Sequence, residues 1–117
     1  MIENSDSLEE EILKLYREPV IGSGYANMYG EVNIVNLVNM YRTMSDEAMA
    51  RMRNMVVDFS RSPDLASSFV SVAVLHALGM KQEVENAYRL AENHDEAQSF
   101  KYHFDIGISL ADHFIGP

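Results

Sequence analysis

Apolar residues recur at three- and four-residue intervals along most of this chain, the spacing that gathers them on one face of an α-helix. No segment shows the sustained alternation of apolar and polar residues that is expected of a half-buried strand. The pattern therefore predicts an all-α fold, a single domain over residues 1–117 with about six helices in one bundle. The helices are expected at about residues 7–17, 32–44, 45–61, 62–79, 82–92 and 95–115.

The most apolar of these segments, residues 62–79, is expected to be the central helix of the bundle. Ser62 is a candidate N-cap and Pro63 suits the first helical position, while Gly79 readily takes the left-handed conformation that follows a helix. Between these ends the only charged side chain is Asp64, and apolar residues cover most faces. A helix that is apolar nearly all round belongs in the middle of a bundle, with its neighbours packed about it.

One stretch resembles a known helix pair. Residues 77–93, with the sequence ALGMKQEVENAYRLAEN, are similar to the helix-turn-helix of tetratricopeptide-type repeats. The resemblance is carried by Leu78, Gly79, Ala87, Tyr88 and Ala91. It implies two antiparallel helices, as in solenoid-like bundles. No second copy at the family's spacing is visible, so the ligand binding of such repeats is not implied.

Residues 19–31, with the sequence PVIGSGYANMYGE, combine glycines with apolar and aromatic side chains. Two interpretations stay open for this segment. It is either a packed connecting loop whose aromatic residues cover the bundle, or a contact loop that presents Tyr25 and Tyr29 to a partner. Its Gly-Ser-Gly run is not followed by the Gly-Lys-Ser/Thr of a phosphate-binding loop.

The chain carries 18 acidic and 9 basic residues, which gives a net charge of −9 with histidine neutral. Such a charge disfavours direct contact with nucleic acid and with acidic membrane surfaces, whereas it attracts a basic protein. The absence of cysteine excludes disulfides, thiolate catalysis and cysteine-bound zinc, and it fits the cytoplasm. The first residues are polar and acidic and show no signal-peptide pattern, so we expect a cytoplasmic protein.

The residue patterns that carry known chemistry are missing. None of the histidines belongs to a metal-binding pair such as H-E-x-x-H, and His103 and His113 would lie about 15 Å apart along one helix. His76, near the end of the central helix, is expected to bond the last carbonyls or to interact with the helix dipole. The serines of that helix lack the G-x-S-x-G turn of hydrolases. We therefore expect no enzymatic activity, no cofactor and no metal site.

A small, acidic, cysteine-free helical domain without catalytic residues resembles the immunity proteins of bacterial toxin–immunity systems, including those of contact-dependent inhibition. The resemblance lies in size, charge and missing chemistry. It implies that the protein binds and neutralises a cognate toxin domain that is basic, such as a nuclease. The alternative is a helical adaptor or regulatory module that acts through protein–protein contacts or homo-oligomerisation.

The residues expected to contact a basic partner are acidic groups and aromatic anchors. The acidic groups are Glu9, Glu10 and Glu11 in the first helix, and Glu83, Glu85, Glu92, Asp95 and Glu96 in the last two helices and the turn between them. The aromatic anchors are Tyr25, Tyr29 and Tyr88. The sequence leaves open which of these surfaces is used.

Overall fold

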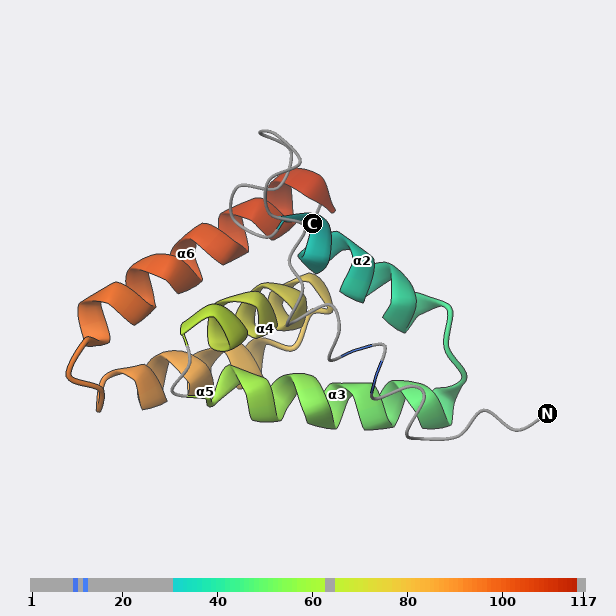
Figure 1. Cartoon of the computed structure of the whole chain (residues 1–117), viewed down its shortest axis with the longest axis horizontal. Helices are drawn as coiled ribbons and strands as arrows, with labels where there is room; N and C mark the ends of the chain where they lie inside the picture. The colour runs from blue at the N-terminus through green and yellow to red at the C-terminus, as the bar shows by residue number, and fades with distance from the viewer. Residues whose placement is uncertain (1–9, 11, 13–30, 63–64, 116–117) are drawn as a thin grey trace.

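The protein consists of helices joined by turns in the residues that its computed structural model describes, which are Glu10, Ile12 and residues 31–62 and 65–115 (Figure 1). Five helices lie in residues 31–115, and no described residue belongs to a strand. They are α2 (Glu31–Arg42), α3 (Asp46–Ser60), α4 (Leu65–Ala77), α5 (Lys81–Ala91) and α6 (Ala97–Phe114). The prediction of an all-α fold is confirmed.

The predicted count of six helices is not reached in the described residues. The helix expected over residues 7–17 falls outside them except for Glu10 and Ile12, which are both helical. Ile12 is fully buried in the main core cluster, so this segment supplies at least one core side chain.

The last helix begins at Ala97, two residues later than predicted. The chain first turns tightly, because the backbone N–H groups of Glu92, Asn93 and His94 each donate to the carbonyl three residues before them. Glu96 occupies the N-cap position without a side-chain hydrogen bond. The start of α6 is therefore set by the turn and not by a capping side chain.

Single residues fix two other helix ends. Ser45 caps α3, because its Oγ accepts a hydrogen bond from the backbone N–H of Ala48 at 3.3 Å. Gly79 follows α4 with a φ of 78°, in the left-handed region. The N–H of Gly79 donates to the carbonyl of His76, and the N–H of Met80 donates to that of Leu75, both at 3.0 Å. This pair of bonds is a Schellman motif, which closes α4 and starts the turn into α5.

α4 contacts each of the other four helices in residues 31–115. Figure 1 shows it between α6 on one side and α3 and α5 on the other. Its residues 72–75 are fully buried. Val72 belongs to a smaller cluster with Phe100 and Phe104, whereas its neighbours in α4 join the main cluster formed with α2 and α3. α4 thus links both parts of the apolar core.

α6 approaches α4 closely at Gly107. A Cβ atom added there would lie 3.1 Å from the ring of Phe69 and 3.2 Å from its carbonyl oxygen, tighter than ordinary van der Waals contact. Glycine weakens a helix interior by about 1 kcal/mol relative to alanine, but here its missing side chain makes room for the neighbouring helix. The position therefore serves close helix packing.

Candidate protein-binding surface

α5 and α6 run antiparallel, and polar contacts join their facing sides near the turn at residues 92–96. Lys101 Nζ lies 3.1 Å from Glu92 Oε2. One turn further along each helix, the hydroxyl of Tyr88 donates to Asp105 Oδ1 at 2.5 Å. Because residues four apart lie on the same face of a helix, these contacts form a continuous row across the helix pair.

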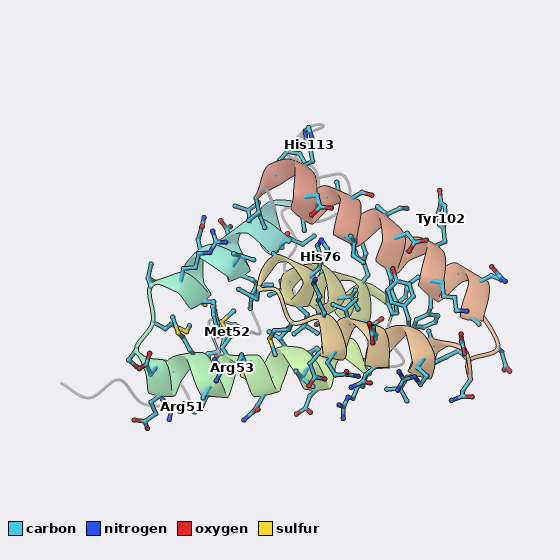
Figure 2. The ribbon with its side chains drawn as sticks, turned by 180° about the vertical axis from the view of Figure 1, so that it is seen from behind. Arg51, Met52, Arg53, His76, Tyr102 and His113 are labelled. Carbon is cyan, nitrogen blue, oxygen red and sulfur yellow. The ribbon has the colours of Figure 1, made fainter. Side chains whose placement is uncertain are left out.

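Asp112, two turns beyond Asp105 on α6, reaches α4 and not α5. Its Oδ1 lies 2.8 Å from Nε2 of His76, and Figure 2 shows the side chain of His76 pointing toward α6. His76 occupies the last turn of α4, where the helix dipole favours positive charge, as the sequence indicated. The carboxylate partner from another helix was not indicated by the sequence.

An open groove of about 550 Å³ runs along α5 beside α6. Three half-buried side chains, Val84, Tyr88 and Ile108, line its deeper part, and three exposed charged residues lie along its edge. The charged residues are Glu85, Arg89 and Glu92. The half-buried lining of this open groove is therefore mainly apolar, and two of the three exposed charged residues at its rim are acidic.

Tyr88 is held in place from two sides. Its ring packs edge-on against Phe104, with ring centroids 5.3 Å apart and planes at 80°. Burial, and then the hydrogen bond to the Asp105 carboxylate and its negative charge, raise the pKa of the Tyr88 hydroxyl. The hydrogen bond to Asp105 orients the hydroxyl. An aromatic side chain fixed in this way is a suitable interface anchor, because little rotamer entropy remains to be lost on binding.

Charge is distributed unevenly over the protein. Residues 81–115 carry seven acidic and three basic side chains, a local net charge of −4: Glu83, Glu85, Glu92, Asp95, Glu96, Asp105 and Asp112 against Lys81, Arg89 and Lys101. Residues 31–62 contain four acidic and four basic side chains. In Figure 2, Arg51 and Arg53 lie on α3, well separated from Tyr102 on α6. The negative charge of the described residues is thus concentrated on α5, α6 and the turn between them.

Of the residues predicted for partner binding, Glu85, Tyr88 and Glu92 come together at the groove. Asp95 and Glu96 are exposed on the neighbouring turn. Glu83 faces the end of α3 instead, where its Oε1 lies 3.5 Å from Nη2 of Arg61, the residue that follows this helix. The acidic surface is therefore smaller than the sequence implied, because one of its glutamates is directed to a neighbouring helix.

The remaining predicted residues belong to the N-terminal part of the chain. Glu10 is exposed. The others, with most of the glycine- and tyrosine-containing loop, lie outside the described residues: Glu9, Glu11, Tyr25, Tyr29 and residues 19–30. Both interpretations of residues 19–31, a packed loop and a contact loop, therefore stay predictions.

Val84 and Arg89 of α5 were not predicted for partner binding, and neither were four residues of α6, namely Lys101, Asp105, Ile108 and Asp112. Their spacing of four, three and four positions places them on one face of that helix, which is a signal that the sequence does contain. The sequence does not indicate which helix that face meets. Only the packing of α6 against α4 and α5 turns the spacing into a row of contacts.

The histidines of α6 and its preceding turn have structural contacts. Nδ1 of His103 donates to the carbonyl oxygen of Ser99 at 2.8 Å, and His94 stacks on Phe100 with ring centroids 4.4 Å apart. In the described part of the chain, no group of three or more histidine, aspartate or glutamate side chains is placed to hold a metal ion. Within those same residues, no helix has both the length and the apolar character required to cross a membrane.

Comparison with known proteins returns no match: no family model, no curated protein and no solved structure corresponds to this chain. The function of the surface on α5 and α6 is therefore inferred from its own geometry and charge.

Proposed function

We propose that this chain is a non-enzymatic protein-binding domain that neutralises a basic partner, as an immunity protein does with its toxin domain. The single observation that supports this proposal is the concentration of acidic side chains on α5, α6 and their turn, beside an apolar groove. A negative surface accelerates the encounter with a basic partner and orients it, because the two electrostatic potentials are complementary.

The groove adds apolar contacts to this electrostatic attraction. Interfaces owe most of their binding energy to a few well-packed residues, and aromatic side chains are prominent among them. Tyr88 fits this role, because its ring is fixed by Phe104 and its hydroxyl by Asp105. On this proposal the acidic rim attracts the partner and the region around Tyr88 provides the packed centre of the contact.

The proposal extends to the rest of the molecule. It assigns α4 the role of the central helix around which the bundle is built, which leaves the outer sides of α5 and α6 available for binding. It also assumes that the protein acts in the cytoplasm of a bacterium, where an immunity protein meets its toxin. The partner is then a protein, and neither nucleic acid nor a membrane is bound directly.

Co-expression with the product of the adjacent upstream gene tests the proposal. We expect the two proteins to co-purify, and we expect their affinity to fall as salt is raised across about 0.05–0.5 M, because salt screens exposed charges. An upstream gene unrelated to any toxin, or a complex indifferent to salt, would contradict the proposal. A stable homodimer that is insensitive to salt would favour the adaptor alternative.

Charge reversal locates the contact. Asp95→Lys combined with Glu96→Lys changes two exposed side chains and removes no side-chain capping bond, so the fold should be retained. We expect this double variant to bind the partner at least about tenfold more weakly. The matched control is Asp58→Lys, an exposed acid in the last turn of α3. Reversal of Glu9–Glu11 tests the acids of the predicted first helix separately.

A further inference from the structure

The rim of the groove carries an ordered pattern of charge along α5. Glu85 and Glu92 are seven residues apart, so they lie on the same side of the helix, about 10.5 Å apart along its axis. Arg89 lies one turn from each of them, and all three line the groove. The charges along the rim are therefore negative, positive and negative in turn, over two turns of the helix.

The two glutamates are accessible to a new cation. Glu85 is exposed and has no cationic partner among the described residues. Glu92 pairs with Lys101, but this ion pair is solvent-exposed on the glutamate side, and such pairs contribute little to stability. Within the described part of the chain, the guanidinium of Arg89 makes one side-chain hydrogen bond, with its Nη1 3.4 Å from Asn86 Oδ1. Replacing these contacts with contacts to a partner therefore costs little free energy.

The spacing of the glutamates decides which backbone fits them. In a helix, positions seven apart share a face at about 10.5 Å, which equals the separation of the two glutamates. In a strand, residues on one face recur at about 6.7 and 13 Å, and neither distance matches. The charge pattern of the rim is therefore complementary to an α-helix laid along α5.

We propose that the groove receives one amphipathic α-helix of the basic partner. This helix carries two basic residues seven positions apart and an acidic residue one turn from each of them. It directs an apolar side chain to Val84, Tyr88 and Ile108. This proposal rests on the proposed function, because it names the element of the basic partner that occupies the same surface. An amphipathic helix in a groove is a common mode of peptide recognition, in which apolar anchors give affinity and the flanking charges set the register.

Two synthetic peptides of identical composition test this proposal against the full chain. The matched peptide carries two arginines seven positions apart and a glutamate between them, one helical turn from each. It also carries a leucine one turn from the first arginine, on the same side of the helix as that arginine. The control peptide carries the same residues with the arginines five positions apart, which places them on different faces of a helix. Fluorescence anisotropy gives the affinities, and amide chemical shifts locate the binding site.

We expect the matched peptide to bind at least about tenfold more tightly than the control peptide, with the largest amide shifts at Val84, Glu85, Tyr88 and Ile108. Glu85→Lys should remove this preference, whereas Asp58→Lys should retain it. Equal affinity of the two peptides, no binding of either, or shifts on other helices would overturn the proposal.

Failure of this proposal is distinguishable from failure of the proposed function. If the matched peptide does not bind but the co-purified partner still loses affinity on Asp95→Lys with Glu96→Lys, the surface is correct and the helical occupant is wrong. If the partner is indifferent to those changes and to reversal of Glu9–Glu11 as well, the proposed function itself is wrong.

Discussion

The two sides of α6 meet the rest of the protein in different ways. Toward α4, α6 presents the buried Gly107 and Ala111, and a Cβ atom added at Gly107 would lie only 3.1 Å from the ring of Phe69. Toward α5, α6 presents Lys101 and Asp105, which make polar contacts beside an open groove. The difference indicates that one side of this helix supports the fold and the other carries the charge available to a partner. Changes on the first side should alter stability, and changes on the second should alter binding.

The largest effect on stability is expected at the contact between α4 and α6. Phe69→Ala removes a ring that is 8% exposed and that packs over Gly107, so it should lower the free energy of unfolding by about 3–5 kcal/mol. Urea denaturation measures the change. The control is Tyr102→Ala on α6. Tyr102 is 64% exposed, so its replacement should lower the free energy of unfolding by less than about 0.5 kcal/mol. Similar losses for both variants would break the distinction between the two sides.

Gly107→Val should be the next most destabilising change. Its branched side chain meets both the ring and the carbonyl oxygen of Phe69, and overpacking of this kind costs about 1–3 kcal/mol. Gly107→Ala should cost less, because the better helix propensity of alanine offsets about 1 kcal/mol of the strain. Thermal unfolding of the two variants is compared with the wild type. If valine is tolerated as well as alanine, the two helices do not depend on this close approach.

On the polar side, Tyr88→Phe removes the hydrogen bond to Asp105 and should cost no more than about 1 kcal/mol at neutral pH, since the pair is partly exposed. Its pH dependence is more specific. Because folding raises the pKa of the hydroxyl, the stabilisation is complete below the pKa of an unfolded tyrosine, about 10, and is lost as the pH rises above it.

The wild type should therefore lose more stability than Tyr88→Phe between about pH 9 and 11.5. Urea denaturation across this range separates Tyr88 from the other tyrosines, because both proteins share them. Parallel stability curves for the two proteins would show that the Tyr88 hydroxyl has no altered pKa in the folded state.

The smallest effect is expected at the contact between His76 and Asp112. Both side chains are partly exposed, so Asp112→Ala should lower the free energy of unfolding by less than about 1 kcal/mol. Differential scanning calorimetry at low and high salt checks this, and the loss should be no larger at high salt. A loss comparable with that of Phe69→Ala would mean that this polar contact between α4 and α6 supports the fold as strongly as the buried contact does.

The features that were predicted from the sequence depend on one residue and its immediate neighbours. Gly79 closes α4 as expected, and α3 begins next to Ser45, where a helix start was expected, because helix ends need only a small set of local backbone conformations. Gly107, a glycine inside a helix, lies where α6 approaches α4 closely. The helix bounds followed from apolar spacing and were displaced mainly at ends that continue into turns, as before α6.

The features that were missed depend on how helices rotate about their axes when they pack. The Tyr88–Asp105 contact joins residues 17 positions apart, and the His76–Asp112 contact joins residues 36 apart. The sequence placed each of these residues on a helix but could not assign its neighbour. For the same reason, Glu83 was grouped with Glu85 although it faces Arg61 at the C-terminal end of α3.

The measurement that tests the central claim most directly is the affinity of the co-purified basic partner for Glu85→Lys, compared with its affinity for Asp58→Lys, by isothermal titration calorimetry at low salt. Both substitutions reverse one exposed acidic side chain, so they change the net charge equally. We predict a loss of about tenfold or more for Glu85→Lys and little change for Asp58→Lys, with both variants as stable as the wild type. Equal affinities for the two variants would contradict the assignment of partner binding to the surface of α5 and α6.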